Sequence, residues 1–307
     1  MDSPKYVNFD ISEVAYKVVN KTNISAFVLV PKGISEGKYP IIAKFHGGFF
    51  VTGASLYPDW FPDWALDYAF KQSAIIVCAD YRLIPESTGL DILEDLKDFW
   101  AWARGGGLER HLSQVKAGIN ADLTKVIAYG ESAGGSLAIQ SGFILPHGFI
   151  KAIIATYPFI DIGRKRTVSI MGAPTIPPVV LDGFLAAIEP GKIVTSANPP
   201  ERMPIVLSIA QQDRFAEFYG ADEKLALRKV LETVDDMPHL LIIHGKEDSA
   251  VPVEGSVEFA DAVRGKFGAG KIDLRVEPGE HGFDGSATLE MPWLKDGLSR
   301  VTELWLN

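Results

Sequence analysis

A Gly-Glu-Ser-Ala-Gly run at residues 130–134 directly follows the apolar segment Val-Ile-Ala-Tyr at residues 126–129. A buried strand that enters a G-x-S-x-G sequence predicts a sharp, strained turn from strand into helix, with the serine at its apex. Glycine is favoured on both sides because neighbouring backbone passes close to such a turn and side chains would clash. We therefore expect Ser132 to project its hydroxyl at a helix N-terminus, where the helix dipole favours developing negative charge.

Short apolar runs typical of strands buried on both faces recur along the chain. They occupy residues 41–45, 74–79, 126–129, 153–156 and 240–243, and a last strand is predicted at 272–276. Helical periodicity separates these runs, most clearly between residues 92 and 103. This alternation predicts an α/β chain with a mostly parallel, doubly wound sheet.

Two regions depart from the alternation of strand and helix. Residues 14–19 and 25–30 alternate in polarity around a turn-like segment, which predicts an antiparallel hairpin at a sheet edge. From about 161 to 238 the pattern lapses into proline-rich breaks and short amphipathic pieces, although residues 204–210 imitate a core strand. We expect a helical cap at about 161–238, inserted into a single domain that spans residues 1–307.

Composition narrows the classes of protein to which the chain can belong. Its 307 residues are 47% hydrophobic, and the net charge of −9 without a Lys/Arg cluster argues against nucleic-acid binding. Cys78 is the single cysteine, so no intrachain disulfide forms and a reducing compartment is favoured. Neither a signal-peptide pattern nor an apolar stretch of membrane-spanning length is evident, and we expect a cytoplasmic protein with no membrane span.

A second glycine-rich segment, Phe-His-Gly-Gly-Phe-Phe-Val-Thr-Gly at residues 45–53, also follows a predicted strand. Paired glycines there allow backbone N–H groups to turn toward a ligand oxygen, as in an oxyanion hole. Each such donor stabilises a transition state by about 3–4 kcal/mol. Ala133, which begins the helix after the serine, is predicted to supply a partner N–H. The alternative is a glycine turn that only lets strand and helix pack.

A serine nucleophile needs a base and an orienting carboxylate. His281 lies in Pro-Gly-Glu-His-Gly-Phe at residues 278–283, just after the last predicted strand, at the sheet edge where catalytic residues gather. The other five histidines lack that setting. The order of serine, acid and histidine along the chain also suits His281 as the base.

We favour Asp248 as the acid, because it follows the predicted strand at 240–243 by a few residues. Glu247 is the adjacent rival and Asp213 a more distant one. Asp284 follows the histidine too closely to orient it easily.

Taken together, these segments resemble the α/β-hydrolase superfamily and, more narrowly, hormone-sensitive-lipase-like esterases and carboxylesterases. The matching pieces are His-Gly-Gly at 46–48, Asp-Tyr-Arg-Leu-Ile-Pro-Glu at 80–86, Gly-Glu-Ser-Ala-Gly-Gly at 130–135, His-Gly-x-x-Asp-x-x-Val-Pro around Asp248, and His-Gly-Phe at 281–283. The resemblance thus covers nearly the whole chain.

The resemblance implies backbone N–H donors at Gly48 and Phe49, with residues 80–86 as a brace for that loop. Phe49 stands where the family usually has a third glycine, and its ring puts the acyl pocket's shape in question. The family's usual Asp-Pro-Leu-x-Asp-Glu segment around the acid is absent. The Asp248 setting looks instead like that of the dienelactone-hydrolase and peptidase branches.

The substrate pocket is predicted from aromatic residues. Trp60 and Phe61 lie in an aromatic stretch after the glycine loop, and Phe184 and Phe215 lie in the cap region. They are candidates for an apolar wall. Ordinary core packing is the competing interpretation.

The leading hypothesis is a serine hydrolase that cleaves carboxylic esters of small or medium apolar acyl groups. Ser132 attacks the carbonyl, His281 is general base and then acid, and Asp248 orients the imidazole. No metal or organic cofactor is expected. The alternative on the same fold is acyl transfer, thioester release, cyclisation or dehydratase-type elimination. A non-catalytic ligand receptor is disfavoured because all three residues are present, and analogy alone suggests a homodimer.

Overall fold

A computed structural model describes residues 3–164 and 169–307 of the chain. Its strands are β1 Phe9–Val19, β2 Thr22–Pro31, β3 Gly37–Phe45, β4 Ile75–Ala79, β5 Ile119–Glu131, β6 Ile150–Thr156, β7 His239–Gly245 and β8 Ile272–Glu277. Its helices are α1 Asp63–Lys71, α2 Gly89–Arg104, α3 Gly107–Val115, α4 Ala133–Ile144, α5 Pro178–Ala186, α6 Met203–Gln211, α7 Phe215–Tyr219, α8 Leu227–Thr233, α9 Val253–Phe267 and α10 Pro292–Leu306.

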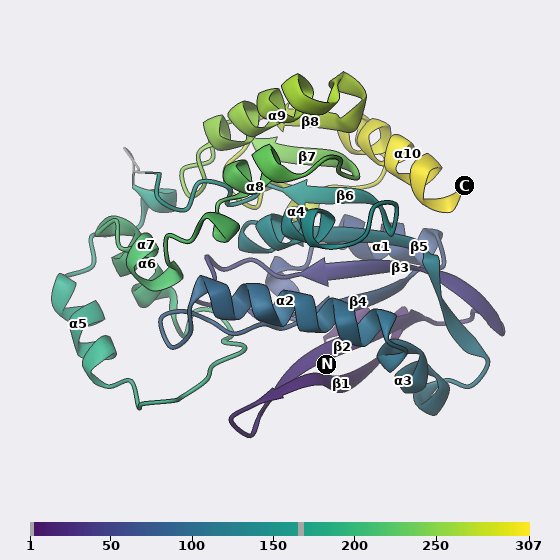
Figure 1. The fold of residues 1–307 in the computed structure, drawn as a ribbon, viewed down its shortest axis with the longest axis horizontal. Helices are drawn as coiled ribbons and strands as arrows, with labels where there is room; N and C mark the ends of the chain where they lie inside the picture. Colours follow the sequence, from purple (N-terminus) through teal and green to yellow (C-terminus); the bar gives the residue numbers. More distant parts are fainter. Residues whose placement is uncertain (1–2, 165–168) are drawn as a thin grey trace.

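The eight described strands form one sheet in the order β1-β2-β4-β3-β5-β6-β7-β8 (Figure 1). β1 and β2 are an antiparallel hairpin at one edge, and β2 also pairs antiparallel with β4. From β4 to β8 every pairing is parallel. The predicted edge hairpin and the predicted mostly parallel α/β sheet are both confirmed. Parallel strands end at a common edge, so the loops after β3, β5, β7 and β8 meet there.

Helices cover both faces of this sheet, which explains why its central strands are apolar on both sides. Along β3, Ile41, Ala43 and Phe45 point into a core shared with α2, α3, α4 and α9. Ile42, between them, packs into the opposite core, which α1 and α10 close with Trp64 and Trp305. Successive side chains of β3 point to opposite faces of the sheet, so one strand contributes to two cores.

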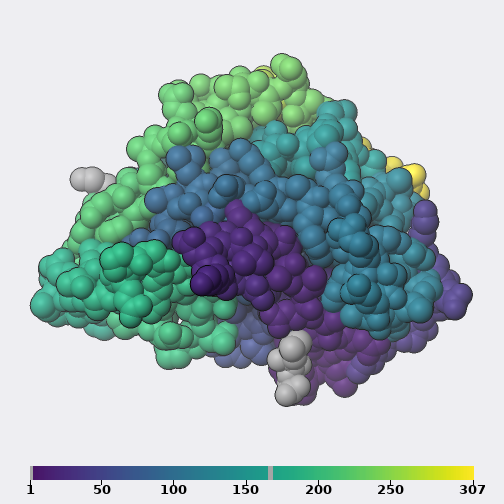
Figure 2. Space-filling view, turned by 60° about the horizontal axis from the view of Figure 1, so that its bottom comes forward, coloured from purple at the N-terminus to yellow at the C-terminus, as the bar shows by residue number. Residues whose placement is uncertain are grey.

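Between β6 and β7 the described residues form the helices α5, α6, α7 and α8 and no strand. Helices α5, α6 and α7 lie beyond the C-terminal ends of the parallel strands, at the left of Figure 1, whereas α8 packs beside α4 and α9. Figure 2 shows residues near α5 as a teal-green lobe. The strand-like segment at 204–210 is part of helix α6, which has proline in its first turn, where no N–H is needed. Among the described helices, none combines the length and apolarity that crossing a bilayer demands.

Candidate active site

The turn between β5 and α4 holds Ser132 in a strained backbone conformation. Its φ of 56° and ψ of −119° lie outside the regions that side-chain-bearing residues ordinarily adopt. A Cβ on Gly130 would lie 2.1 Å from the Gly134 carbonyl oxygen, and one on Gly134 would lie 2.0 Å from the Phe45 oxygen. Both contacts are impossible, so the close approach of backbone requires glycine on either side of the serine.

His281 and Asp248 meet at the same sheet edge, although 33 positions separate them along the chain. Asp248 follows β7 and His281 follows β8, and Nδ1 of His281 lies 2.7 Å from Oδ2 of Asp248. The other carboxylate oxygen of Asp248 accepts hydrogen bonds from the backbone N–H groups of Ala250 and Val251. This arrangement leaves Nε2 as the imidazole nitrogen that is available for proton transfer.

Asp248 is suited to remain ionised. Burial pushes the pKa of its carboxyl upward, but hydrogen bonds from His244 and His281 and from the Val251 N–H outweigh that effect and hold the pKa below its usual range. The fully buried His244 has Nε2 3.3 Å from Oδ2 of Asp248 and Nδ1 2.8 Å from Ser256 Oγ. Sequence reasoning did not anticipate this second histidine.

The rival acids have other positions in the structure. A carboxylate oxygen of Glu247 accepts a hydrogen bond from the Gly279 N–H at 2.7 Å. Asp213 is exposed just beyond the end of α6. Asp284 is fully buried and bonds to Trp64 and Tyr157.

The glycine-rich loop after β3 turns back on itself beside Ser132. The N–H groups of Val51 and Thr52 both bind the Gly48 carbonyl, at 2.9 and 3.0 Å. Phe49 accepts a φ of +57°, and its ring is nearly buried. That ring stacks on Phe215 at 5.5 Å between centroids, so the chain gives a phenylalanine at this position a packed environment.

Opposite this loop, α4 begins at Ala133. The first N–H groups of a helix have no carbonyl partner one turn earlier and are oriented toward the space before the helix. The N–H of Ala133 is the first of these groups in α4.

A cavity of about 250 Å³ connects these groups. Gly48, Phe49, Ser132 and His281 all line it. Apolar side chains complete much of its wall, namely Ile170, Met171, Met203, Val206 and Leu207. These five residues come from the region predicted to be a cap, and sequence reasoning did not single them out; the apolar runs at 170–171 and 203–207 were the available signal.

The four predicted wall residues are distributed unevenly. Trp60 lines the cavity, whereas Phe61 is buried on the far face of the sheet with the Lys44 ammonium 4.3 Å from its ring centre. Phe215 stands behind Phe49, and Phe184 on α5 packs against the Arg202 guanidinium. Of the four aromatic residues that were predicted to form the wall, Trp60 is the one found among the described residues that line the cavity.

The segment at 80–86 contacts the glycine loop closely. The Tyr81 hydroxyl donates to the His46 carbonyl at 2.6 Å, and the two rings stack at 4.3 Å. A carboxylate oxygen of Asp80 accepts the Ser55 N–H at 2.8 Å. Tyr81 and Asp80 therefore fix both ends of the loop.

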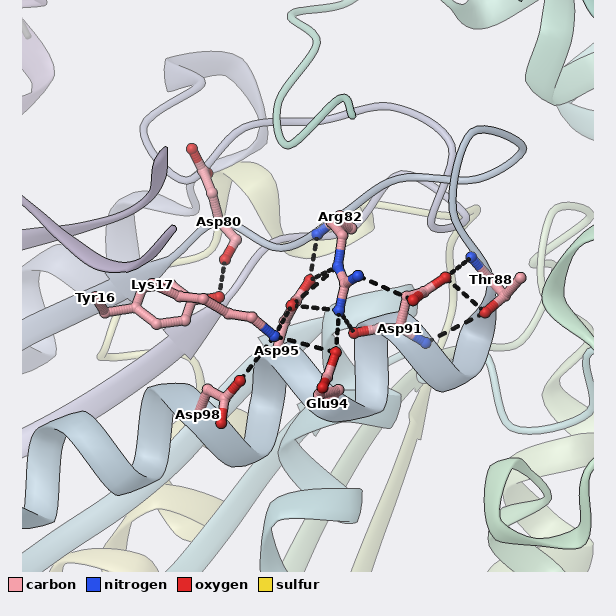
Figure 3. A network of polar contacts seen from close by, with 9 residues as sticks. All are labelled: Tyr16, Lys17, Asp80, Arg82, Thr88, Asp91, Glu94, Asp95 and Asp98. Atoms are coloured by element: carbon pink, nitrogen blue, oxygen red, sulfur yellow. Dashed lines mark hydrogen bonds and ion pairs between the residues drawn. The ribbon is translucent and has the colours of Figure 1, made fainter. Parts of the chain in front are cut away.

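An ionic network anchors this segment to α2 (Figure 3). Arg82 binds the fully buried Asp95 through its side chain and its own N–H, and it also reaches Asp91 and Glu94. Lys17 from β1 joins Asp95 at 2.9 Å. Because Arg82 and Lys17 both pair with Asp95, this buried carboxylate is not left as an isolated charge.

Burial perturbs two groups beside the loop in opposite directions. It lowers the pKa of His46 to about 3, which keeps that imidazole neutral, and it raises the pKa of Asp80 to about 6. In the described residues no group of three or more His, Cys, Asp and Glu side chains is arranged to hold a metal ion.

Comparisons with known proteins agree with this architecture. A probable carboxylesterase, M8, from Phoma sp. is 31% identical over 99% of this chain and 100% of its own length. A probable carboxylesterase, clz11, from Cochliobolus lunatus is 31% identical over 62% of this chain and 92% of its own length. The propionate-bound Thermogutta terrifontis esterase Est2 has a similar fold, with a TM-score of 0.63, 18% identity, and coverage of 99% of this chain and 95% of that one. Residues 42–251 match the alpha/beta hydrolase fold family, and the chain therefore belongs to that family.

Proposed function

We propose that this protein is a carboxylesterase that uses Ser132, His281 and Asp248 as its catalytic triad. The observation that carries the proposal is the 2.7 Å contact between His281 and Asp248 at the wall of the cavity that Ser132 also lines. The full-length similarity to a probable carboxylesterase supports the same reaction class. No separate observation favours acyl transfer, cyclisation or elimination.

In this mechanism the Ser132 hydroxyl attacks the ester carbonyl while Nε2 of His281 takes its proton. In the described part of the chain the Ser132 hydroxyl has no hydrogen-bond partner. A hydrogen bond from this hydroxyl to Nε2 of His281 is expected to form when substrate binds. His281 then protonates the leaving alcohol, and water hydrolyses the acyl-enzyme by the reverse sequence. Asp248 holds the imidazole tautomer and stabilises the imidazolium.

The developing oxyanion is proposed to sit between the N–H groups of Gly48, Phe49 and Ala133. The helix dipole of α4 adds to their effect, because its positive end faces the same point. The wall of the cavity suits small or medium apolar acyl groups. We assign residues 161–238 the role of a cap, because Ile170, Met203 and their neighbours close one side of the cavity.

The test is hydrolysis of p-nitrophenyl esters from acetate to decanoate by wild type and Ser132→Ala, with matched acyl thioesters as a second series. We expect ester turnover by wild type that falls about 10⁴-fold or more in Ser132→Ala. The thermal midpoint should stay close to that of wild type, since the change removes one oxygen atom. Folded wild type that acts on thioesters alone would replace the esterase proposal by thioester release, and turnover unaffected in Ser132→Ala would refute the triad.

A further inference from the structure

Asp284 is a buried carboxylate for which the proposed mechanism has no use. It lies three residues after His281, in the short 3₁₀ helix Phe283–Ser286, and its exposed fraction is 0%. Oδ1 accepts the Tyr157 hydroxyl at 2.8 Å, and Oδ2 accepts the Trp64 indole N–H at 2.9 Å. An indole N–H can only donate. Both carboxylate oxygens are therefore used as acceptors.

The two donors to Asp284 come from distant parts of the chain, and of the two only Tyr157 has a ring contact with His281 in the described residues. Trp64 belongs to α1, on one face of the sheet, and Tyr157 directly follows β6. The Tyr157 ring lies 4.4 Å from the His281 ring between centroids, at an angle of 56°. Asp284 thus fixes the tyrosine against which the imidazole packs, as well as the loop that carries the imidazole.

No lysine or arginine side chain in the described part of the chain forms an ion pair with Asp284. Among the described residues no Lys or Arg nitrogen lies within 4.0 Å of it, and Lys44, a buried cation of the same region, is paired with Glu131 at 2.6 Å. Burial raises the pKa of Asp284, while the bonds from Trp64 and Tyr157 and the proximity of His281 act against that rise. A buried carboxylate without a cation favours the formation of positive charge beside it.

Other ionisable groups surround His281 and set the background for this effect. Asp248 touches Nδ1, and His244 stands behind Asp248. The carboxylate of Glu280 is occupied by the N–H groups of His281 and Ser249.

Asp59 and Glu131 also line the cavity. Neither residue contacts the imidazole through any hydrogen bond or ion pair in the described part of the chain, and the charge of Glu131 is paired with Lys44.

We propose that Asp284 is a positioning residue for His281: it holds the imidazole through Tyr157, and its buried negative charge stabilises the imidazolium form. The inference rests on the proposed function, in which His281 becomes an imidazolium after it takes the Ser132 proton. It gives the histidine two carboxylates with different tasks. Asp248 orients Nδ1 by direct contact, and Asp284 acts on the ring face through a tyrosine.

The decisive variant is Asp284→Asn, with two readouts. An NMR titration of the imidazole carbon signals gives the pKa of His281, assigned by comparison with His281→Gln, and needs no substrate. We expect this pKa to fall by about 0.5–1 unit, because a nearby negative charge is removed. The acid limb of kcat/KM for p-nitrophenyl butyrate should move to lower pH by the same amount, with kcat reduced about tenfold and KM within twofold.

Asp95→Asn is the matched control, because Asp95 is equally buried and lies in the α2 network away from the cavity. It should lower the thermal midpoint without moving the pKa of His281. An unchanged His281 pKa in Asp284→Asn, or an equal change in Asp95→Asn, overturns the inference. Absence of ester turnover in wild type, with the NMR shift intact, would instead refute the proposed function and leave the electrostatic coupling in place.

A second pair of variants tests the route through the tyrosine and does not depend on the folding of Asp284→Asn. Tyr157→Phe keeps the ring but removes the hydroxyl, and Trp64→Phe removes the other donor at a residue outside the cavity lining. We expect kcat to fall about three- to tenfold in Tyr157→Phe and to stay within about twofold in Trp64→Phe. Equal losses in both would mean that Asp284 has only a structural role.

Discussion

The two loops that flank Ser132 are held by different kinds of interaction. The glycine loop after β3 is fixed by backbone hydrogen bonds, by the neutral His46 stacked on Tyr81, and by a strand-like bridge between Gly53 and Ala197. The histidine loop after β8 is fixed by carboxylates: Asp248 contacts the imidazole, and Asp284 binds Tyr157, which packs against the imidazole.

This difference matches what each loop is proposed to do. A loop that offers N–H groups to an oxyanion benefits from rigidity and from the exclusion of competing charge. A loop that carries a proton acceptor benefits from negative charge that stabilises the protonated ring. Changes in charge are therefore expected to affect catalysis on the histidine side and stability on the glycine side.

The largest effect is expected from Asp248→Asn. Without the carboxylate the imidazole loses its preferred tautomer, and kcat should fall about 10³- to 10⁴-fold while KM changes little. Steady-state kinetics on a short-chain p-nitrophenyl ester measures this. Asp213→Asn is the matched control at an exposed acid and should retain wild-type kcat. The opposite outcome would move the acid assignment to Asp213.

Asp80→Asn tests whether charge on the glycine side affects stability. The pKa of Asp80 in the folded protein is raised to about 6, so its contribution to stability is present below the ordinary value of 3.8 and is lost as pH rises through 6. Urea unfolding from pH 7 to 4 should show the variant losing up to about 3 kcal/mol relative to wild type as pH falls. Parallel curves would mean that Asp80 does not bind that proton.

His46 gives the opposite pH dependence and serves as the internal control for Asp80. Its folded pKa of about 3 lies below the ordinary 6.5, so its contribution is present above 6.5 and is lost as pH falls. His46→Asn should therefore gain stability relative to wild type over the range in which Asp80→Asn loses it. If both variants changed in stability in the same direction relative to wild type as pH falls, the opposite pKa shifts of Asp80 and His46 would be contradicted.

A smaller effect is expected from Glu280→Gln. The Glu280 carboxylate accepts hydrogen bonds from the Ser249 N–H and hydroxyl and from the His281 N–H, which ties the acid loop to the histidine loop. An amide keeps one acceptor oxygen, so at least one of these three charge-assisted bonds is lost and the others weaken, and we expect kcat to fall about tenfold. A loss of kcat as large as that of Asp248→Asn, measured in the same assay, would contradict the view that Glu280 only connects the two loops.

The smallest effect is expected from Tyr81→Phe. It removes the 2.6 Å hydrogen bond to the His46 carbonyl and keeps the stacked ring. Unfolding free energy should fall by about 0.5–1.5 kcal/mol, and ester turnover should stay within about twofold. A tenfold loss of kcat without loss of stability would mean that the glycine loop is as sensitive to single polar contacts as the histidine loop.

Much of the fold was predictable because its signals are local. The parallel strands were recognisable as short apolar runs, because a strand that is buried on both faces has no alternation of polar and apolar residues. The extent of β5 was not predictable in the same way. It begins at Ile119, well before the apolar run at 126–129, because residues 119–121 pair with the start of β3 at 37–39. Pairing with a distant strand leaves no mark on local periodicity.

In the candidate site, too, the features that depend on local sequence were predictable and those that depend on packing were not. The glycines at 130 and 134 follow from the sterics of one turn, and the order of Ser132, Asp248 and His281 follows from where strands end. The aromatic wall was harder to anticipate, since an aromatic residue packs equally well in a core or a cavity. Phe61 packs in the core that α1 and α10 close, whereas aliphatic residues of the proposed cap line the cavity.

The sequence by itself determined the strained serine turn, the parallel sheet and the edge at which the candidate residues gather, because each depends on the size and polarity of near neighbours. Only the tertiary structure decided that His244 stands behind Asp248 and that Asp284 reaches His281 through Tyr157. Those contacts join residues from separate strands and helices. Their geometry is set by how the layers pack, which no short stretch of sequence contains.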